Sequence, residues 1–211
     1  MKQAAFYRAW WVGAVVGAIV CVGCFGKSQP SRFYTLSAIA PASAVSTPDS
    51  PLRNATIGIG PIKIADYLDR YKIVTRTGDN RIDLSEYDQW AGSFEDNLIH
   101  VLAENIGAMV PTEQIYLYPW RTSLPTDFQV VVDIVRCDGR LKGDVLLVAR
   151  WRILAGQEKE VLTVRRSSIS EAVRYPGYEA LVAAQSRALA ILSREIVEQI
   201  HAVGRKQRSG N

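Results

Sequence analysis

Histidine and cysteine are scarce in this chain, and their scarcity excludes several kinds of site. The 211 residues include only two histidines and three cysteines. Neither His100 nor His201 has a metal-ligand partner at a useful spacing, so no metal site is expected. A Gly-x-Ser-x-Gly elbow and a Walker loop are also absent, and Gly58-Ile-Gly60 lacks the third glycine of a nucleotide loop. The sequence therefore predicts neither an enzyme nor a cofactor, and the two glycines indicate a bulge or a close packing site in a strand.

A strong excess of either charge is missing too. The chain carries 25 basic and 21 acidic residues, and removal of an N-terminal segment with Lys2 and Arg8 would bring these numbers closer. Nucleic-acid binding is not expected, because no motif interleaves basic and aromatic residues. Residues 204–211 are basic and predict a disordered tail.

The N-terminus has the pattern of an export signal. Basic residues are followed by an apolar run over residues 10–22, which is short for a membrane-spanning helix. The run ends at Gly23-Cys24, which resembles the cleavage site of bacterial lipoproteins. We expect residues 1–23 to be a signal peptide and Cys24 to carry a diacylglycerol and an N-acyl chain. The alternatives are an uncleaved anchor helix, or an ordinary signal with a chance cysteine.

This interpretation fixes the expected location and the state of the cysteines. Several acyl chains hold a protein on a membrane stably. Phe25, and not Asp, follows the lipidated position, which by resemblance to sorting rules favours the periplasmic face of the outer membrane; the inner membrane is the alternative. Cys21 would leave with the signal, so Cys137 has no disulfide partner and is expected in the core.

The remaining chain predicts one domain. Residues 24–31 would be a tether and residues 32–203 a single α+β domain. Residues 38–55 are rich in Pro, Ala and Ser and indicate a loop or linker. Strands are expected at 32–37, 56–64, 71–77, 81–85, 115–118, 128–135, 145–154 and 161–169.

Two amphipathic helices complete the predicted fold. Apolar residues recur at helical spacing over 89–109, including Trp90 and Phe94, and again over 178–202. The alternating strands and these helices predict a mostly antiparallel sheet with two long amphipathic helices packed on one face.

Several short segments occur together in an order typical of one family. They are Arg32-Phe-Tyr-Thr-Leu36, Ile57-Gly-Ile-Gly-Pro-Ile62, Tyr67-Leu-Asp-Arg70, Ile73-Val-Thr-Arg76, Trp90, Val101-Leu-Ala-Glu-Asn105, Tyr118-Pro-Trp120, Val130-Val-Val-Asp-Ile-Val-Arg136 and Ala149-Arg-Trp151. In this order the chain resembles the ABC-type transport auxiliary lipoproteins. The resemblance implies a non-catalytic component that docks to a periplasm-spanning MCE-domain protein with an inner-membrane partner, in a pathway for lipids or other hydrophobic molecules. It also implies a homo-oligomeric ring.

Two aromatic segments are the candidate partner contacts. The first is Tyr67, Leu68, Asp69, Arg70 and Tyr71, and the second contains Tyr118 and Trp120; both have the composition of interface hot spots. The plainer interpretation is that these aromatics pack over a sheet edge and that Arg70 or Arg76 pairs with a local carboxylate. Two other functions stay open: a periplasmic lipid carrier, which needs an apolar cavity between sheet and helices, and an envelope hydrolase.

Overall fold

The computed structural model describes residues 29–39, 50, 52–120, 125–155 and 160–209. The chain divides into two compact units, residues 1–31 and 32–211. Of the first unit, only residues 29–31 are described, and they are exposed. The predicted signal peptide, Cys24 and most of the Pro-rich segment at 38–55 lie outside the described residues.

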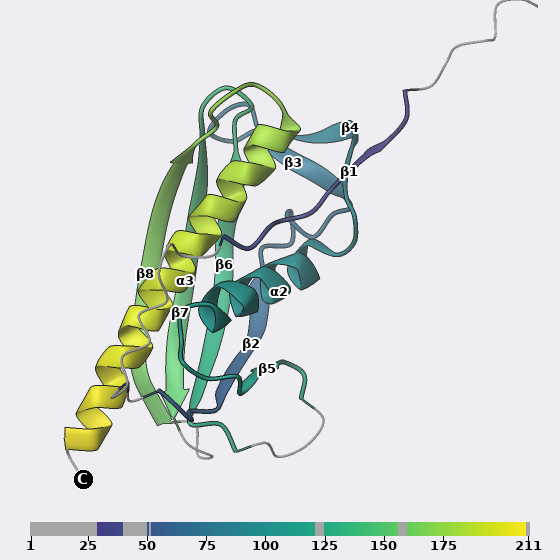
Figure 1. Ribbon diagram of the computed structural model, residues 1–211. Helices are drawn as coiled ribbons and strands as arrows, with labels where there is room; N and C mark the ends of the chain where they lie inside the picture. The colour runs from purple at the N-terminus through teal and green to yellow at the C-terminus, as the bar shows by residue number, and fades with distance from the viewer. Residues whose placement is uncertain (1–28, 40–49, 51, 121–124, 156–159, 210–211) are drawn as a thin grey trace, which may run out of the picture. The chain divides into compact units, whose positions relative to one another are not determined.

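The second unit contains two sheets (Figure 1). The three-stranded sheet has the order β1 (Arg32–Tyr34), β4 (Ile82–Trp90), β3 (Lys72–Arg76). The five-stranded sheet has the order β5, β2, β6, β7, β8. Its strands are β2 (Ile57–Ile64), β5 (Ile115–Leu117), β6 (Phe128–Gly139), β7 (Asp144–Ala155) and β8 (Glu160–Ala172).

The α+β class agrees with the sequence, but the sheets are more mixed than predicted. Within the described strands, β1 is parallel to β4, and β2 is parallel to both β5 and β6. The pairs β3–β4, β6–β7 and β7–β8 are antiparallel. Apolar residues alternate in the same way in parallel and antiparallel strands, so alternation does not indicate the direction of a neighbouring strand. Only the short turns between β6, β7 and β8 indicate their antiparallel pairing.

The two helices begin and end differently from the prediction. Helix α2 (Phe94–Gly107) starts after Ser93, whose side chain accepts a hydrogen bond from the Asp96 amide. Trp90 is the last residue of β4 and not part of the helix, although its ring stacks on Phe94 at 4.5 Å. Helix α3 (Tyr178–Ser209) includes residues 204–209 of the segment predicted as a disordered basic tail.

The core lies between the helices and one face of the five-stranded sheet (Figure 1). Helix α3 packs on β6, β7 and β8, and α2 packs on β2 and β5. Side chains on the facing surfaces, such as Val130, Ile153 and Leu192, are fully buried. Cys137 is buried as predicted, and burial raises the pKa of its thiol to about 12.

Candidate functional site

The face of the five-stranded sheet that points away from the helices carries an ordered grid of side chains. Directly paired residues of neighbouring strands point to the same side of a sheet. One row contains Lys63 on β2, Asp133 on β6, Arg150 on β7 and Arg166 on β8. The next row contains Val131, Arg152 and Val164. We call this surface, with Lys63, Val131, Asp133, Arg150, Arg152, Val164 and Arg166, the outer face.

The charges of the outer face have no partners among the described residues. The outer face holds four cations and one acid, Asp133, and all five of these charged side chains are exposed. Arg150 and Arg166 lie directly opposite each other, an arrangement that destabilises a sheet because the charges repel. A shallow groove of about 510 Å³ runs over this grid, bordered by Pro61. The surface is therefore positively charged, partly apolar and open.

Trp120 lies at the edge of the outer face. A Cβ atom on Gly58 would come within 2.9 Å of the Trp120 ring, so the absent side chain of Gly58 lets the indole lie against β2. Tyr118 meets Trp120 edge to face at 5.5 Å. Gly60 has a φ of +114° and sits at a register shift of β2. Both interpretations of the Gly58-Ile-Gly60 segment, a bulge and a close packing site, are thus confirmed.

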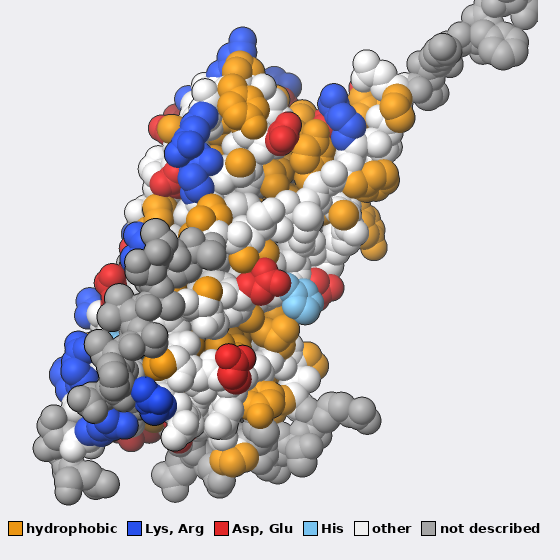
Figure 2. All heavy atoms as spheres, in the orientation of Figure 1, with side chains coloured by type: hydrophobic (Ala, Val, Ile, Leu, Met, Phe, Trp, Pro, Cys, Tyr) orange, Lys and Arg blue, Asp and Glu red, His pale blue; other side chains and the backbone are white. Residues whose placement is uncertain are grey.

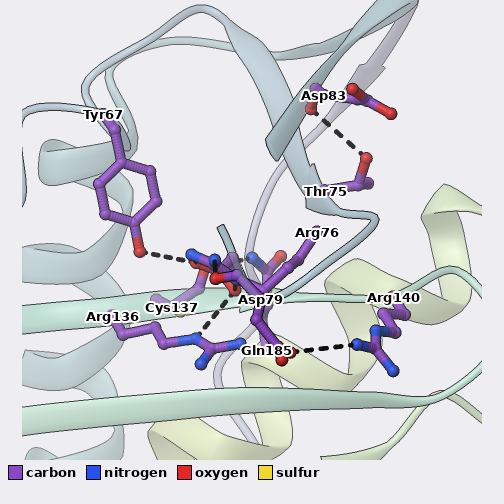
Figure 3. Close-up of polar contacts among 10 residues, drawn as sticks. Tyr67, Thr75, Arg76, Asp79, Asp83, Arg136, Cys137, Arg140 and Gln185 are labelled. Atoms are coloured by element: carbon purple, nitrogen blue, oxygen red, sulfur yellow. Dashed lines mark hydrogen bonds and ion pairs between the residues drawn. The ribbon is translucent and has the colours of Figure 1, made fainter. Parts of the chain in front are cut away.

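A buried carboxylate joins the two sheets (Figure 3). Asp138 on β6 is completely buried. Its oxygens accept hydrogen bonds from Arg76 Nε at 2.9 Å and Nη2 at 3.0 Å, from Arg136 Nε at 3.0 Å, and from the Tyr67 hydroxyl at 2.6 Å. Because Arg76 belongs to β3 and Tyr67 to the segment before it, this cluster ties the three-stranded sheet to β6. We call these four residues the seam.

The electrostatics of the seam favour the ionised carboxylate. Burial alone would raise the pKa of Asp138, but hydrogen bonds from Arg76 and Tyr67 and the charge of Arg136 outweigh it and lower that pKa. Burial and the bond to Asp138 raise the pKa of the Tyr67 phenol. The carboxylate therefore stays ionised between two guanidinium groups and the Tyr67 phenol stays neutral, which is the behaviour of a structural ion cluster.

The first predicted contact segment is divided by the fold. Tyr67 takes part in the seam, and Leu68 is only 2% exposed and packs in the core. Asp69, Arg70 and Tyr71 are exposed, and the Arg70 guanidinium donates to the Asp69 carbonyl. Of the two arginines considered for a local carboxylate pair, Arg76 pairs with a carboxylate, but Asp138 is 62 residues away in the chain, so the pair is not local. Only Asp69, Arg70 and Tyr71 of this segment are available to a partner.

A second buried carboxylate fixes the first strand of the domain. Asp88 on β4 accepts hydrogen bonds from Arg32 Nε at 2.8 Å and Nη2 at 2.9 Å, and from the Tyr34 hydroxyl at 2.8 Å. Ser85 also donates to it. Burial raises the pKa of Asp88, but the bonds from Arg32, Tyr34 and Ser85 have the larger combined effect and lower it. Strand β1 is therefore held on the sheet by charged hydrogen bonds.

The part of the chain that the structure describes has neither a cluster of metal ligands nor a membrane-spanning helix. No group of three or more His, Cys, Asp or Glu residues lies close enough there to hold a metal ion. None of the described helices is both long and apolar enough to cross a bilayer.

The sequence did not identify the outer face. Its charged residues are spread over 103 positions of the chain, from Lys63 to Arg166, and only the strand register brings the four strands that carry them together. Asp133, Arg150 and Arg152 occupy the polar positions of strands in which polar and apolar residues alternate. This pattern gave no indication of which strands would be neighbours.

Known proteins support this fold. The chain is similar over 82% of its length to an uncharacterised protein of known crystal structure, 99% of which is covered, with 18% identity and a TM-score of 0.66. It is also similar to protein XCC0632 from Xanthomonas campestris, with 15% identity, a TM-score of 0.69 and coverage of 85% of this chain and 99% of that one. A search of curated proteins gives no match.

A family model settles the class of protein. The model for the ABC-type transport auxiliary lipoprotein component matches residues 34–197, which is nearly the whole of the second unit. The chain therefore belongs to the family of ABC-type transport auxiliary lipoproteins.

Proposed function

We propose that the chain is a lipid-anchored periplasmic accessory protein that docks to the envelope-spanning MCE-domain component of an intermembrane transport system. The single observation that supports docking best is the outer face. This surface of the chain holds four cations and one acid, and these charged side chains have no partner among the described residues. An auxiliary component of a transport system is expected to act by contact with another protein. An acidic surface on another protein would relieve the repulsion between Arg150 and Arg166.

Trp120 and Tyr118 supply the second element of the proposed contact. Aromatic residues next to arginines are typical of the residues that dominate binding energy at interfaces. Trp120 lies beside the outer face over Gly58, and the Tyr118 side chain is 46% exposed. Asp69, Arg70 and Tyr71 form a separate exposed group and are the second candidate contact.

The lipid-carrier alternative receives less support. A carrier needs an apolar cavity of several hundred Å³. Between the five-stranded sheet and the helices, however, the facing side chains are fully buried and pack on one another. Of the described grooves that approach this volume, one mixes apolar side chains with four charged residues and the other is lined mainly by polar and charged residues.

The anchor completes the proposal. Membership of a lipoprotein family agrees with acylation of Cys24, which we assign as a diacylglycerol and an N-acyl chain. We propose the periplasmic face of the outer membrane as the location, with the inner membrane as the alternative, and a homo-oligomeric ring as the assembly.

A pull-down from gently solubilised envelopes tests this function. A C-terminal tag is placed on the wild type, on Cys24→Ala and on the double variant Arg150→Glu/Arg152→Glu. The wild type is expected to bring down an MCE-domain protein identified by mass spectrometry, and the double variant at least tenfold less. Arg194→Glu, at an exposed position of α3, is the matched control and should behave like the wild type.

Two results would count against the proposal in different ways. If Cys24→Ala fractionates with membranes like the wild type, the anchor is wrong. If the wild type retains no MCE-domain protein, or if the control and the double variant lose it equally, the docking role of the outer face is wrong.

A further inference from the structure

We propose that the groove beside the turn between β6 and β7 binds one phosphate group, with Arg136 at its floor and Arg140 and Lys142 at its rim. The groove has a volume of about 470 Å³ and borders the seam. This site goes beyond the docking role, because it includes no residue of the outer face and does not depend on acylation of Cys24.

A β-bulge in β6 directs Arg136 towards this groove. Ile134 pairs with Ala149 and Arg136 pairs with Val148, so β6 has one extra residue between the two pairs. The bulge inverts the alternation of the strand. Cys137 therefore shares the buried face with Ile134, and Arg136 points away from the helices, to the side on which the seam and the groove lie.

Arg136 has more hydrogen-bond donors than the seam uses. Asp138 accepts two hydrogen bonds from Arg76, one from Arg136 Nε and one from the Tyr67 hydroxyl, which fills the acceptor positions of a carboxylate. The Nη1 and Nη2 groups of Arg136 have no acceptor among the described residues, although the side chain is only 31% exposed. Guanidinium donors that line a groove without a protein acceptor favour the binding of an anion.

The seam also has one positive charge in excess. Arg76 and Arg136 share a single carboxylate, that of Asp138, and the raised pKa of Tyr67 keeps its phenol neutral. The Arg76 side chain is mostly buried and the Asp138 side chain completely so. A charge that is partly withdrawn from water is unfavourable unless another charge balances it, and an anion over Arg136 would do so.

The turn after β6 adds two cations at the rim. Arg140 and Lys142 are exposed and line the groove. Arg140 pairs loosely with Asp79, at 3.7 Å (Figure 3), and Lys142 has no partner among the residues that the structure describes. Figure 2 shows Lys and Arg side chains gathered at the end of the domain where this turn lies, at the top of Figure 1.

The charges of the groove favour a single phosphate group over an extended polyanion. A phosphate ester carries a charge of about −1.5 to −2 and three acceptor oxygens, which suits three cationic side chains. Asp79 and Asp144 line the same groove and would repel a polyanion spread across the rim. A compact group over Arg136 has the cations close to it and these exposed acids further out. Inorganic phosphate and a phosphate ester share this chemistry.

Isothermal titration calorimetry tests the proposal on the full chain in a non-ionic detergent. The probes are inorganic phosphate and glycerol 3-phosphate, and circular dichroism verifies that each variant is folded. Three variants change the groove, and a fourth, the matched control, removes one arginine and one lysine from exposed positions of α3. They are Arg136→Gln, Arg140→Gln/Lys142→Gln, Asp79→Asn and, as the control, Arg194→Gln/Lys206→Gln.

The affinity for phosphate is expected to fall at least tenfold in Arg136→Gln and at least fivefold in Arg140→Gln/Lys142→Gln, and to stay within twofold in the control. Asp79→Asn should bind at least twofold more tightly, since it removes an acid from the rim, and a merely structural role of these residues predicts no such gain. If Arg136→Gln does not fold, the exposed rim variants decide the outcome.

The two probes distinguish the sources of the phosphate group. Glycerol 3-phosphate bound at least as tightly as inorganic phosphate would identify an ester as the ligand, and binding of inorganic phosphate alone would identify the free ion. If the wild type binds neither probe at millimolar concentration, or if the rim double variant and the control lose affinity equally, the proposal is overturned. Neither result would affect the docking proposal, which rests on other residues.

Discussion

The two sheets of the domain each leave one surface uncovered by the helices, but the surfaces differ in how their charges are balanced. On the three-stranded sheet, Arg32 and Arg81 have carboxylate partners, and exposed Phe33 and Leu84 share the sheet with exposed Lys72 and Glu86. On the outer face of the five-stranded sheet, Arg150 and Arg166 face each other without a partner among the described residues. Like charges placed opposite each other suit a surface that meets an oppositely charged protein.

The seam between the sheets gives the largest expected effect. Asp138→Ala leaves the half-buried guanidinium groups of Arg76 and Arg136 without their carboxylate. Loss of one partner of a buried ion cluster destabilises strongly, so the free energy of unfolding should fall by about 3 kcal/mol. Urea denaturation measures the change. The matched control is Asp133→Ala on the outer face, where a change within about 0.5 kcal/mol is expected.

Gly60 gives a smaller effect at the edge of the outer face. Gly60→Ala places a side chain at a φ of +114° and 2.6 Å from the Tyr118 Cβ atom. Strain and the displaced backbone should lower the free energy of unfolding by about 2 kcal/mol. Thermal unfolding tests this expectation, with Gly92→Ala as the control, because a Cβ on Gly92 meets nothing within 4 Å. Equal losses at both glycines would contradict the packing described for Tyr118.

Acid should weaken both the junction between the sheets and the attachment of β1. Asp88 and Asp138 have lowered pKa values in the folded protein. The stabilisation that these carboxylates provide is therefore present above their pKa in the unfolded chain, about 3.9, and is lost as the pH falls through their lower pKa values in the folded protein. Tyr67→Phe removes one hydrogen bond that lowers the pKa of Asp138. Its acid transition, followed by circular dichroism, should therefore begin at a higher pH than that of the wild type. An unchanged acid transition would mean that this bond does not contribute.

The smallest effect on stability is expected where the effect on docking is largest. Arg150→Glu/Arg152→Glu changes exposed side chains that have no described partner, so the free energy of unfolding should change by no more than about 0.5 kcal/mol. A loss of several kcal/mol, measured by urea denaturation, would show that the outer face serves the fold and would remove the basis for the docking proposal.

The fold was partly predictable because its local patterns are strong. The long alternating strands β6, β7 and β8 and the amphipathic stripe of α3 follow from hydrophobic periodicity. The position of Trp90 could not be predicted in this way. Trp90 and Phe94 are four residues apart, which is helical spacing, although Trp90 ends a strand and only Phe94 belongs to the helix. The parallel pairing of β2 with β6 depends on contacts between residues about 70 positions apart, such as Gly58 and Gln129, which a single sequence does not reveal.

The candidate site was less predictable than the fold. Trp120 was singled out by its composition, and its position over Gly58 depends on a contact across 62 residues. Leu68 was included with its exposed neighbours, although it packs in the core. Charge alternation alone could not assign Lys63, Asp133, Arg150 and Arg166 to one row, because that row exists only once three strand registers are known.

Site-specific photo-crosslinking in living cells tests the difference between the two surfaces most directly. A benzophenone amino acid replaces Val164 on the outer face or Leu84 on the three-stranded sheet of the full-length chain. The Val164 position is expected to form an adduct with an MCE-domain protein identified by mass spectrometry, and the Leu84 position none. An adduct with that protein from Leu84 and not from Val164, or from neither position, would contradict the assignment of the outer face as the docking surface.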